Sequence, residues 1–224
     1  MLIAGFQKNS FVDYPGKIAA VVFTPHCNMR CWYCHNRHIL GHDAELLDEQ
    51  AVLEFLDRRK GALDAVVISG GEPTLRANLP LFIDVLRDMG YLVKLDTNGT
   101  NPKMLASLIQ AGKLDYVAMD IKAPFEKYGE ITQVKDDIAA IRQSATLLIN
   151  GGIDYEFRTT FAPNLTPEDI GTLAREIQGA KRYYLQQYRP RDKEDPHSHT
   201  PEELNAAAEC ARAVLGDAVI VRGL

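Results

Sequence analysis

The sequence has few cysteines, a single tryptophan and no excess of basic residues. Only four of its 224 residues are cysteine, too few and too unevenly spaced for the disulfide framework of a secreted protein. Thirty acidic residues against 25 basic ones give a formal net charge of −5, which disfavours binding to nucleic-acid phosphates. No apolar run approaches the roughly 20 residues that span a bilayer, and the first residues do not resemble a signal peptide. We therefore expect a cytoplasmic protein that binds neither membranes nor nucleic acid directly.

The content of apolar residues is high enough for a substantial buried core. Hydrophobic residues make up 46% of the chain, and the composition is not that of a disordered, fibrous or disulfide-rich protein. We expect a single domain over residues 1–224. It comprises an N-terminal extension over residues 1–16 and a cysteine-containing loop over residues 26–42.

Short apolar stretches alternate with helical patterns along the chain. The apolar, β-branched stretches predict six strands, at residues 19–23, 65–68, 92–95, 116–121, 155–161 and 183–187. Helices are predicted between and after them, at residues 48–59, 79–89, 102–111, 136–150, 166–177 and 201–215. This alternation is typical of an α/β fold whose parallel strands are joined by right-handed crossovers. It leaves two architectures open, a partial (β/α)6 barrel and an open doubly wound sheet.

Polar and glycine residues occur where the predicted strands end. Three cysteines follow the first strand, and the next three strands end in Gly-Gly-Glu-Pro (70–73), Asp-Thr-Asn-Gly (96–99) and Asp-Ile-Lys (120–122); Arg158 lies within the fifth. In both architectures ligands bind at the carboxyl ends of the strands. Each motif taken singly is also explained as an ordinary turn. Their occurrence at successive strand ends predicts a ligand site at that edge of the sheet.

Three of the four cysteines, Cys27, Cys31 and Cys34, lie within eight residues. Structural zinc sites and fully ligated iron–sulfur clusters normally have four protein ligands. Three thiolates therefore indicate a metal site with one position left open for chemistry. From the cysteines alone, a closed zinc site with His26 or His35 as the fourth ligand is the alternative.

The Cys-x3-Cys-x2-Cys spacing, with the aromatic Tyr33 before the last cysteine, resembles the cluster loop of the radical S-adenosylmethionine (SAM) superfamily. The glycyl-radical-enzyme activases are similar also in His35-Asn36 and in the motifs at residues 70–73, 96–99 and 120–122. The activating proteins of anaerobic ribonucleotide reductase resemble the chain further at residues 5–10, 13–16, 157–160 and 185–188. This resemblance covers nearly the whole chain and implies a partial (β/α)6 barrel of parallel strands, of the radical SAM type.

The resemblance implies an oxidoreductase with two cofactors. Cys27, Cys31 and Cys34 would hold three irons of a [4Fe–4S] cluster, and SAM would chelate the fourth iron. With an electron from a flavodoxin- or ferredoxin-type donor, the cluster would cleave SAM to methionine and a 5′-deoxyadenosyl radical. The radical would generate a glycyl radical on a partner enzyme, expected to be anaerobic ribonucleotide reductase. No catalytic residue is expected apart from the cluster and SAM.

The resemblance also implies which residues bind SAM. Gly70 and Gly71 would allow close backbone approach, and Glu72 with its adjoining carbonyls would accept hydrogen bonds from the methionine ammonium. Tyr33 would lie near the adenine, although an aromatic residue in such a loop is more often simply packed. The cofactor-binding set further includes Asn98, Lys122 and Arg158. The cations Lys122 and Arg158 would face the SAM carboxylate or ribose side. The alternative for both cations is an internal salt bridge.

A monovalent cation beside SAM is a further expectation from the resemblance. Its ligands would be Asp96, Thr97, Asp120 and the carbonyl of Ala118, since hard oxygen ligands suit such an ion. The chain departs from the activase of pyruvate formate-lyase at Gln187-Tyr188-Arg189, where that enzyme has a histidine after Pro-Tyr, so the resemblance supports no SAM contact there.

Two other functions stay open. Cluster and SAM motifs are shared across the superfamily, so a radical SAM enzyme acting on a small molecule or another peptide is one alternative. A zinc-binding or redox-sensing module is the other. We assign no function to Cys210, to His197 and His199 in the loop 191–200, or to the pair Asp136-Asp137, which have ordinary structural explanations.

Overall fold

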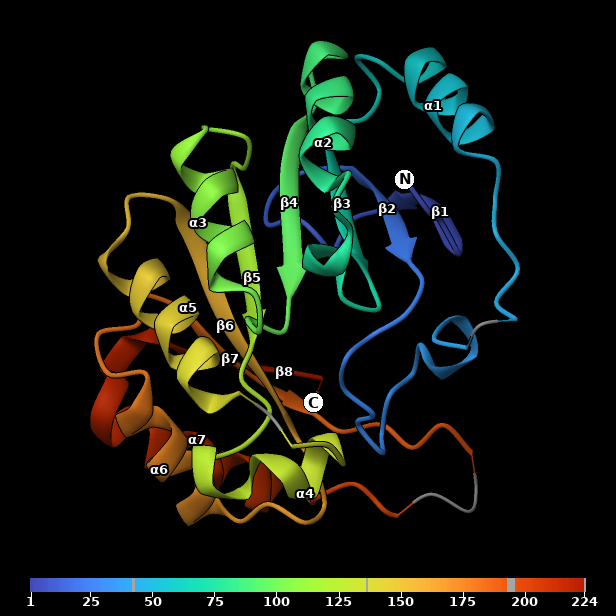
Figure 1. Ribbon diagram of the computed structural model, residues 1–224. Helices are drawn as coiled ribbons and strands as arrows, with labels where there is room; N and C mark the ends of the chain where they lie inside the picture. Colours follow the sequence, from blue (N-terminus) through green and yellow to red (C-terminus); the bar gives the residue numbers. More distant parts are fainter. Residues whose placement is uncertain (42, 136, 193–195, 224) are drawn as a thin grey trace. The chain divides into compact units, whose positions relative to one another are not determined.

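The computed structural model describes residues 1–41, 43–135, 137–192 and 196–223 (Figure 1). His42 of the cysteine-containing loop, the predicted helix start at Asp136 and residues 193–195 of the loop 191–200 lie outside the described residues. The chain forms two compact units, which we call the first unit (Met1–Asn28 and Asn36–Ala118) and the second unit (Met29–His35 and Met119–Leu224). The expectation of a single domain stays a prediction.

The first unit is built around parallel strands. Its elements are β1 (Gly5–Ser10), β2 (Ala19–Thr24), α1 (Glu49–Arg58), β3 (Ala65–Gly70), α2 (Leu79–Asp88), β4 (Leu92–Thr97), α3 (Pro102–Gln110) and the first residues of β5 (Tyr116–Asp120), with short 3-10 turns η1 (Arg37–Ile39) and η2 (Pro73–Leu75). Strands β2, β3 and β4 run parallel, with Val21, Val67 and Lys94 in register. Strand β1 pairs antiparallel with β2.

The second unit continues the alternation of strands and helices. Its elements are η3 (Phe125–Lys127), α4 (Tyr128–Thr132), α5 (Ile138–Asn150), β6 (Asp154–Phe161), α6 (Pro167–Glu176), β7 (Tyr183–Gln187), α7 (Pro201–Leu215), η4 (Gly216–Ala218) and β8 (Val219–Arg222). Strands β6, β7 and β8 are parallel to one another.

The order of the strands decides between the two predicted architectures. Among the described residues the strands are hydrogen-bonded in chain order from β1 to β8. An open doubly wound sheet reverses its strand order at a switch point, and this order contains no reversal. The predicted α/β class and the partial barrel of parallel strands are therefore confirmed.

The six predicted strands correspond to β2–β7, with boundaries shifted by at most two residues. The outer strands β1 and β8 were not predicted. Strand β1 has the sequence Gly-Phe-Gln-Lys-Asn-Ser and is largely exposed, so it lacks the apolar signal of a buried strand. Strand β8 is only four residues long. The short helix α4 was missed as well, because five residues are too few to show a helical period.

Side-chain caps hold the starts of α1 and α6. Asp48 accepts a hydrogen bond from the amide of Gln50 at the start of α1. Thr166 and Asp169 form a reciprocal capping box at the start of α6, which has proline in its first turn. None of the helices in the described part of the chain is long and apolar enough to cross a membrane.

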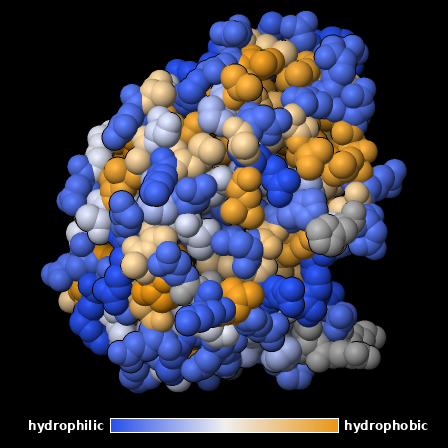
Figure 2. Space-filling model, in the orientation of Figure 1, coloured by the Kyte–Doolittle hydropathy of each residue, from blue (hydrophilic) through white to orange (hydrophobic). Residues whose placement is uncertain are grey.

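A compact apolar cluster fills one face of the first unit's sheet. It consists of buried residues from three strands and from the segment before β2, namely Ala19, Val21, Ala65, Val67, Tyr116 and Tyr14. Apolar residues also reach the surface: α2 exposes Leu81 and Val85, and Figure 2 shows apolar surface in the upper part of the view, where α2 lies. The carboxyl ends of the strands, beyond this cluster, carry the polar motifs.

Candidate functional site

Gly70, the last residue of β3, and Gly71 after it allow two backbone segments of the first unit to touch. The amide of Gly71 donates to the carbonyl of Thr24 at 2.8 Å, and the amide of Glu72 donates to the carbonyl of His26 at 2.9 Å. A Cβ added to Gly71 would lie 1.8 Å from the His26 carbonyl oxygen. Gly70 has a positive φ of 108°, and its Cβ would lie 2.4 Å from the Thr24 amide nitrogen. Glycine is thus required here by the protein's own backbone.

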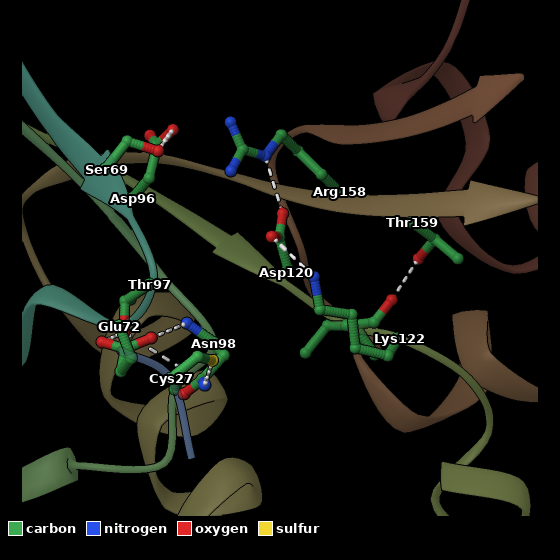
Figure 3. Close-up of polar contacts among 12 residues, drawn as sticks. Cys27, Ser69, Glu72, Asp96, Thr97, Asn98, Asp120, Lys122, Arg158 and Thr159 are labelled. Carbon is green, nitrogen blue, oxygen red and sulfur yellow. Dashed lines mark hydrogen bonds and ion pairs between the residues drawn. The ribbon is translucent and has the colours of Figure 1, made fainter. Parts of the chain in front are cut away.

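Glu72 is fully buried in the first unit, and its carboxylate is surrounded by donors. It accepts from the Thr74 amide at 3.1 Å and hydroxyl at 2.6 Å, from the Thr97 hydroxyl at 2.8 Å and from the Asn98 amide at 2.6 Å (Figure 3). Burial raises the pKa of Glu72, and these hydrogen bonds oppose that shift. The carboxylate therefore ties the end of β3 to the end of β4.

Asn98 connects this network to the first cysteine. Its side-chain amide nitrogen lies 3.8 Å from the Cys27 sulfur and donates to Asn28 Oδ1 at 2.9 Å (Figure 3). Asn28 in turn donates to the Thr100 hydroxyl at 2.9 Å. No sequence motif predicted a role for Asn28 or Thr100. Hydrogen bonds to a ligating sulfur tune an iron–sulfur centre, so an amide next to the cysteine is the signal that could have identified Asn28.

Asp96 faces a buried lysine of the same strand. Lys94 Nζ donates to Asp96 Oδ1 at 2.8 Å and to the carbonyl oxygen of Asp13 at 2.7 Å. The Ser69 hydroxyl donates to the other carboxylate oxygen at 3.1 Å (Figure 3). Lys94 was not among the predicted site residues. Its signal is a lysine within an apolar strand, two residues before an aspartate, because residues i and i+2 of a strand share a face.

Asp120, Lys122 and Arg158 form an ion-paired group in the second unit. Lys122 Nζ donates to Asp120 Oδ2 at 2.9 Å, and Arg158 Nε donates to Asp120 Oδ1 at 2.8 Å; Figure 3 shows both cations directed at this carboxylate. Burial alone would raise the pKa of Asp120, but the two cations outweigh it and hold that pKa well below its usual range. Asp120 in the same way raises the pKa of Lys122 against the effect of burial. The internal salt bridge foreseen as the alternative for both cations is thus present.

The second and third cysteines lie in a turn held by α4. The Cys34 amide donates to the Cys31 carbonyl at 3.0 Å, and the flanking amides of Arg30 and Trp32 donate to carbonyls at the end of α4. Cys31 is buried and Cys34 is half-buried. Burial raises the pKa of the Cys31 thiol, while the charge of Lys122 lowers it. Within the described residues, no three histidine, cysteine or acidic side chains are gathered as a ready metal-binding group.

Tyr33 belongs to an aromatic cluster of the second unit. Its ring centre lies 5.4 Å from that of Trp32 and 6.3 Å from that of Tyr188, and Trp32 and Tyr188 are 5.5 Å apart. Edge-on packing at these distances is favourable. Burial raises the pKa of the Tyr33 hydroxyl. The packing explanation for Tyr33 therefore holds, and its contact with adenine stays a prediction.

Two of the residues to which we assigned no function, His199 and Cys210, pack against other parts of the second unit. His199 stacks on the Phe161 ring with centres 3.9 Å apart, and its Nε2 lies 3.1 Å from the carbonyl oxygen of Ala162. Cys210 packs against Gly171, where an added Cβ would lie 3.3 Å from the cysteine Cβ. These contacts link α7, and His199 just before it, to neighbouring segments of the second unit.

Known proteins are similar to this chain in sequence. The family model described as the radical SAM superfamily matches residues 21–177. The Methanocaldococcus jannaschii protein named "Putative glycyl-radical enzyme activating enzyme MJ1227" is 37% identical over 203 residues, which cover 87% of this chain and 82% of that protein.

Two solved structures resemble the fold at low sequence identity. Streptococcus suis SuiB matches 91% of this chain with a TM-score of 0.70 and 14% identity, and the chain spans about half of SuiB (49%). A domain of the pyruvate-formate lyase-activating enzyme from Bacteroides vulgatus matches 71% of this chain and 99% of that domain, with a TM-score of 0.57 and 16% identity. On the strength of the family match over more than half of its length, the chain belongs to the radical SAM superfamily, whose cofactors are a [4Fe–4S] cluster and SAM.

Proposed function

We propose that the chain is an activase that generates a glycyl radical on a partner enzyme, with anaerobic ribonucleotide reductase as the expected partner. The observation that carries the proposal is the similarity over most of both chains to the M. jannaschii protein, whose name describes an activating enzyme of this kind. The resemblance of residues 5–10, 13–16, 157–160 and 185–188 to reductase activating proteins supports the choice of partner.

Cys27, Cys31 and Cys34 are the proposed ligands of the cluster. They are the three thiols of one short loop, and their chemistry fits an iron–sulfur centre that leaves one iron to another ligand. The amide of Asn98 lies 3.8 Å from the Cys27 sulfur. Asn98 would act as a hydrogen-bond donor to that ligand and influence the reduction potential of the cluster.

The strand ends of the first unit are proposed to bind the amino group of SAM. The Glu72 carboxylate already accepts four hydrogen bonds, so we assign the ammonium chiefly to the carbonyls that adjoin it in the stretch 70–73. Glu72 would hold these carbonyls in place. Gly70 and Gly71 keep the loop free of side chains, and Thr97 and Asn98 complete its support.

Lys122 and Arg158 are the proposed partners of the SAM carboxylate. Both cations now share a single carboxylate, Asp120, and their side chains are 17% and 15% exposed. An arriving carboxylate would find two charged donors whose protonation is already secured by Asp120. Binding would therefore require only a change of partner and no change of charge.

When bound, the cluster and SAM supply a one-electron reductive cleavage that yields methionine and a 5′-deoxyadenosyl radical, which leaves as 5′-deoxyadenosine after taking a hydrogen atom from the glycine Cα. The chain's own residues bind, orient and charge-balance these groups. A flavodoxin- or ferredoxin-type protein is the proposed source of the electron.

The cluster assignment is tested by substituting single cysteines. Protein reconstituted without oxygen is expected to bind about four irons per chain and, on reduction, to release 5′-deoxyadenosine from SAM. Cys31→Ala is expected to abolish this release, whereas Cys210→Ala, a cysteine outside the loop, leaves it intact. Cleavage of SAM by the Cys31→Ala protein would overturn the assignment.

The partner is tested by electron paramagnetic resonance. Mixing the reduced, SAM-loaded protein with anaerobic ribonucleotide reductase of the same source is expected to give a glycyl radical signal on the reductase. SAM cleavage without any such signal would favour the alternative, a radical SAM enzyme acting on a small molecule or another peptide.

A further inference from the structure

Lys94 is an unusual residue for the interior of a sheet. It lies in register with Val21 and Val67 on neighbouring strands, and it is 1% exposed. A buried ammonium is strongly unfavourable unless it is paired. The partners of Lys94 are the Asp96 carboxylate and the carbonyl of Asp13. The ring centre of Tyr116 lies 5.9 Å from its nitrogen.

Of the four groups expected to bind a monovalent cation, the side chains of Asp96, Thr97 and Asp120 are engaged by other groups of the protein. Asp96 accepts from Lys94 on one carboxylate oxygen and from Ser69 on the other. The Thr97 hydroxyl donates to Glu72 and accepts from the amide of Gly99 at 3.1 Å. In the second unit, Asp120 already has two cations of its own. These surroundings do not fit a site that needs a metal ion for charge balance.

We propose that the Lys94 ammonium is the resident cation of Asp96, in place of the monovalent metal ion that the resemblance to other activases implies. Lys94 is thus a positioning residue that acts through Asp96. The proposal rests on the proposed function for its link to SAM. It predicts that the protein binds and cleaves SAM independently of potassium or sodium.

The Asp13 carbonyl gives this lysine a second anchor. Asp13 belongs to the segment before β2, where its side chain accepts from the Ser10 hydroxyl at 2.5 Å and its neighbour Tyr14 is buried in the apolar cluster. Lys94 therefore connects the N-terminal extension to the end of β4. The Lys94 ammonium is covalently attached to β4. A metal ion has no such attachment, so it would not connect the two segments in this way.

Two substitutions of Lys94 separate the charge from the space it occupies. Lys94→Ala removes the ammonium and leaves room for an ion, whereas Lys94→Met removes it and fills most of the room. In choline chloride, both variants are expected to unfold roughly 6–20 °C below the wild type, because breaking a buried pair leaves an uncompensated charge.

Replacing choline with potassium at equal ionic strength then tests the proposal. Potassium is expected to raise the Tm of Lys94→Ala by about 5 °C or more and to leave the wild type and Lys94→Met unchanged. The SAM affinity of the reconstituted proteins, measured by calorimetry, is expected to respond to potassium in the same way. It should rise for Lys94→Ala and stay unchanged for the wild type and Lys94→Met. A potassium-specific rise in the wild type would overturn the proposal, and so would an Lys94→Ala protein that responds no more than Lys94→Met.

A double variant keeps the test decisive if the single variants unfold. Lys94→Met combined with Asp96→Asn removes both charges, so it is expected to be more stable than Lys94→Met alone; a double variant that is no more stable would overturn the ion pair.

The thermal measurements need no SAM chemistry. If the wild type failed to cleave SAM under any salt, the proposed function would fail while the proposal for Lys94 would still be judged by the Tm values.

Discussion

Glu72 and Asp120 are two carboxylates at strand ends that the structure satisfies in opposite ways. Glu72, in the first unit, is fully buried and accepts only from amides and hydroxyls. Asp120, in the second unit, is 27% exposed and is held by the cations of Lys122 and Arg158. The pKa of Glu72 is raised, and that of Asp120 is lowered.

The difference separates a fixed part of the first unit from an adaptable part of the second. Four donors from a β-strand end and a turn hold Glu72, and they lose their only common acceptor if it leaves. The cations on Asp120 are long side chains that can turn to another anion without losing charge compensation. We therefore expect Glu72 to determine the geometry of the ends of β3 and β4. The cations around Asp120 are expected to change partner when a ligand binds.

The largest effect is expected from Glu72→Ala. It leaves several buried donors without an acceptor, each costing about 1–3 kcal/mol, so the free energy of unfolding should fall by roughly 4 kcal/mol or more. Chemical denaturation measures this loss. The surface substitution Glu54→Ala is the control, since Glu54 is exposed on α1, and an equal cost for both variants would refute a structural role for Glu72.

Asp120→Asn is expected to cost on the order of 3 kcal/mol, because two largely buried cations lose their partner. The loss should depend on pH. The folded-state pKa of Asp120 lies below its ordinary value of 3.8, so its stabilisation is complete above pH of about 4 and is lost as the pH falls towards the folded-state pKa. The difference in Tm between wild type and variant should thus be constant near neutrality and shrink below pH of about 4. A difference that grew in acid would contradict the ion-paired assignment.

Gly71→Ala tests whether the fixed part depends on close backbone approach. The added Cβ would meet the His26 carbonyl oxygen at 1.8 Å, and such overpacking costs about 1–3 kcal/mol. Gly152→Ala is the matched control, since neither glycine has a positive φ and nothing lies within 4 Å of the added Cβ at Gly152. Equal unfolding free energies for the two variants would show that the backbone at His26 moves aside at little cost, and would contradict the need for close approach.

The smallest effect on stability is expected from Lys122→Met, about 1 kcal/mol, because Arg158 still pairs with Asp120. SAM binding should suffer more, with a Kd raised by roughly tenfold or more through the loss of one charge-assisted hydrogen bond. Calorimetry on reconstituted protein measures the Kd, and Lys113→Met, which removes a lysine paired with Asp84 in the first unit, serves as the control. An unchanged Kd would place the SAM carboxylate elsewhere.

The sequence predicted the elements with a strong periodic signal and the motifs at their ends. Strands β2–β7 and the helices predicted to start at residues 48 and 166 were found because buried strands and amphipathic helices leave local patterns. Strand β1 escaped since its residues are polar and its pairing depends on β2, which lies nine residues further along the chain.

The contacts within the candidate site were harder to predict. Nothing local in the sequence indicates that Glu72 would accept from Thr97 and Asn98, more than 20 residues away. The salt bridge of Asp120 with Lys122 was foreseeable from their i, i+2 spacing, whereas its pairing with Arg158 depends on a separate strand. Lys94 had the same spacing to Asp96 as Lys122 has to Asp120, and the signal was there to be used.

The contact between Gly71 and His26 also has a consequence on the scale of evolution. Any residue larger than glycine at position 71 would require the segment from Thr24 to His26 to move, since its backbone occupies the space of the missing side chain. The two segments, 45 residues apart in sequence, can therefore diverge only together. In related chains, a replacement at the position of Gly71 should be accompanied by an altered length or conformation between the first strand of the barrel and the first cysteine.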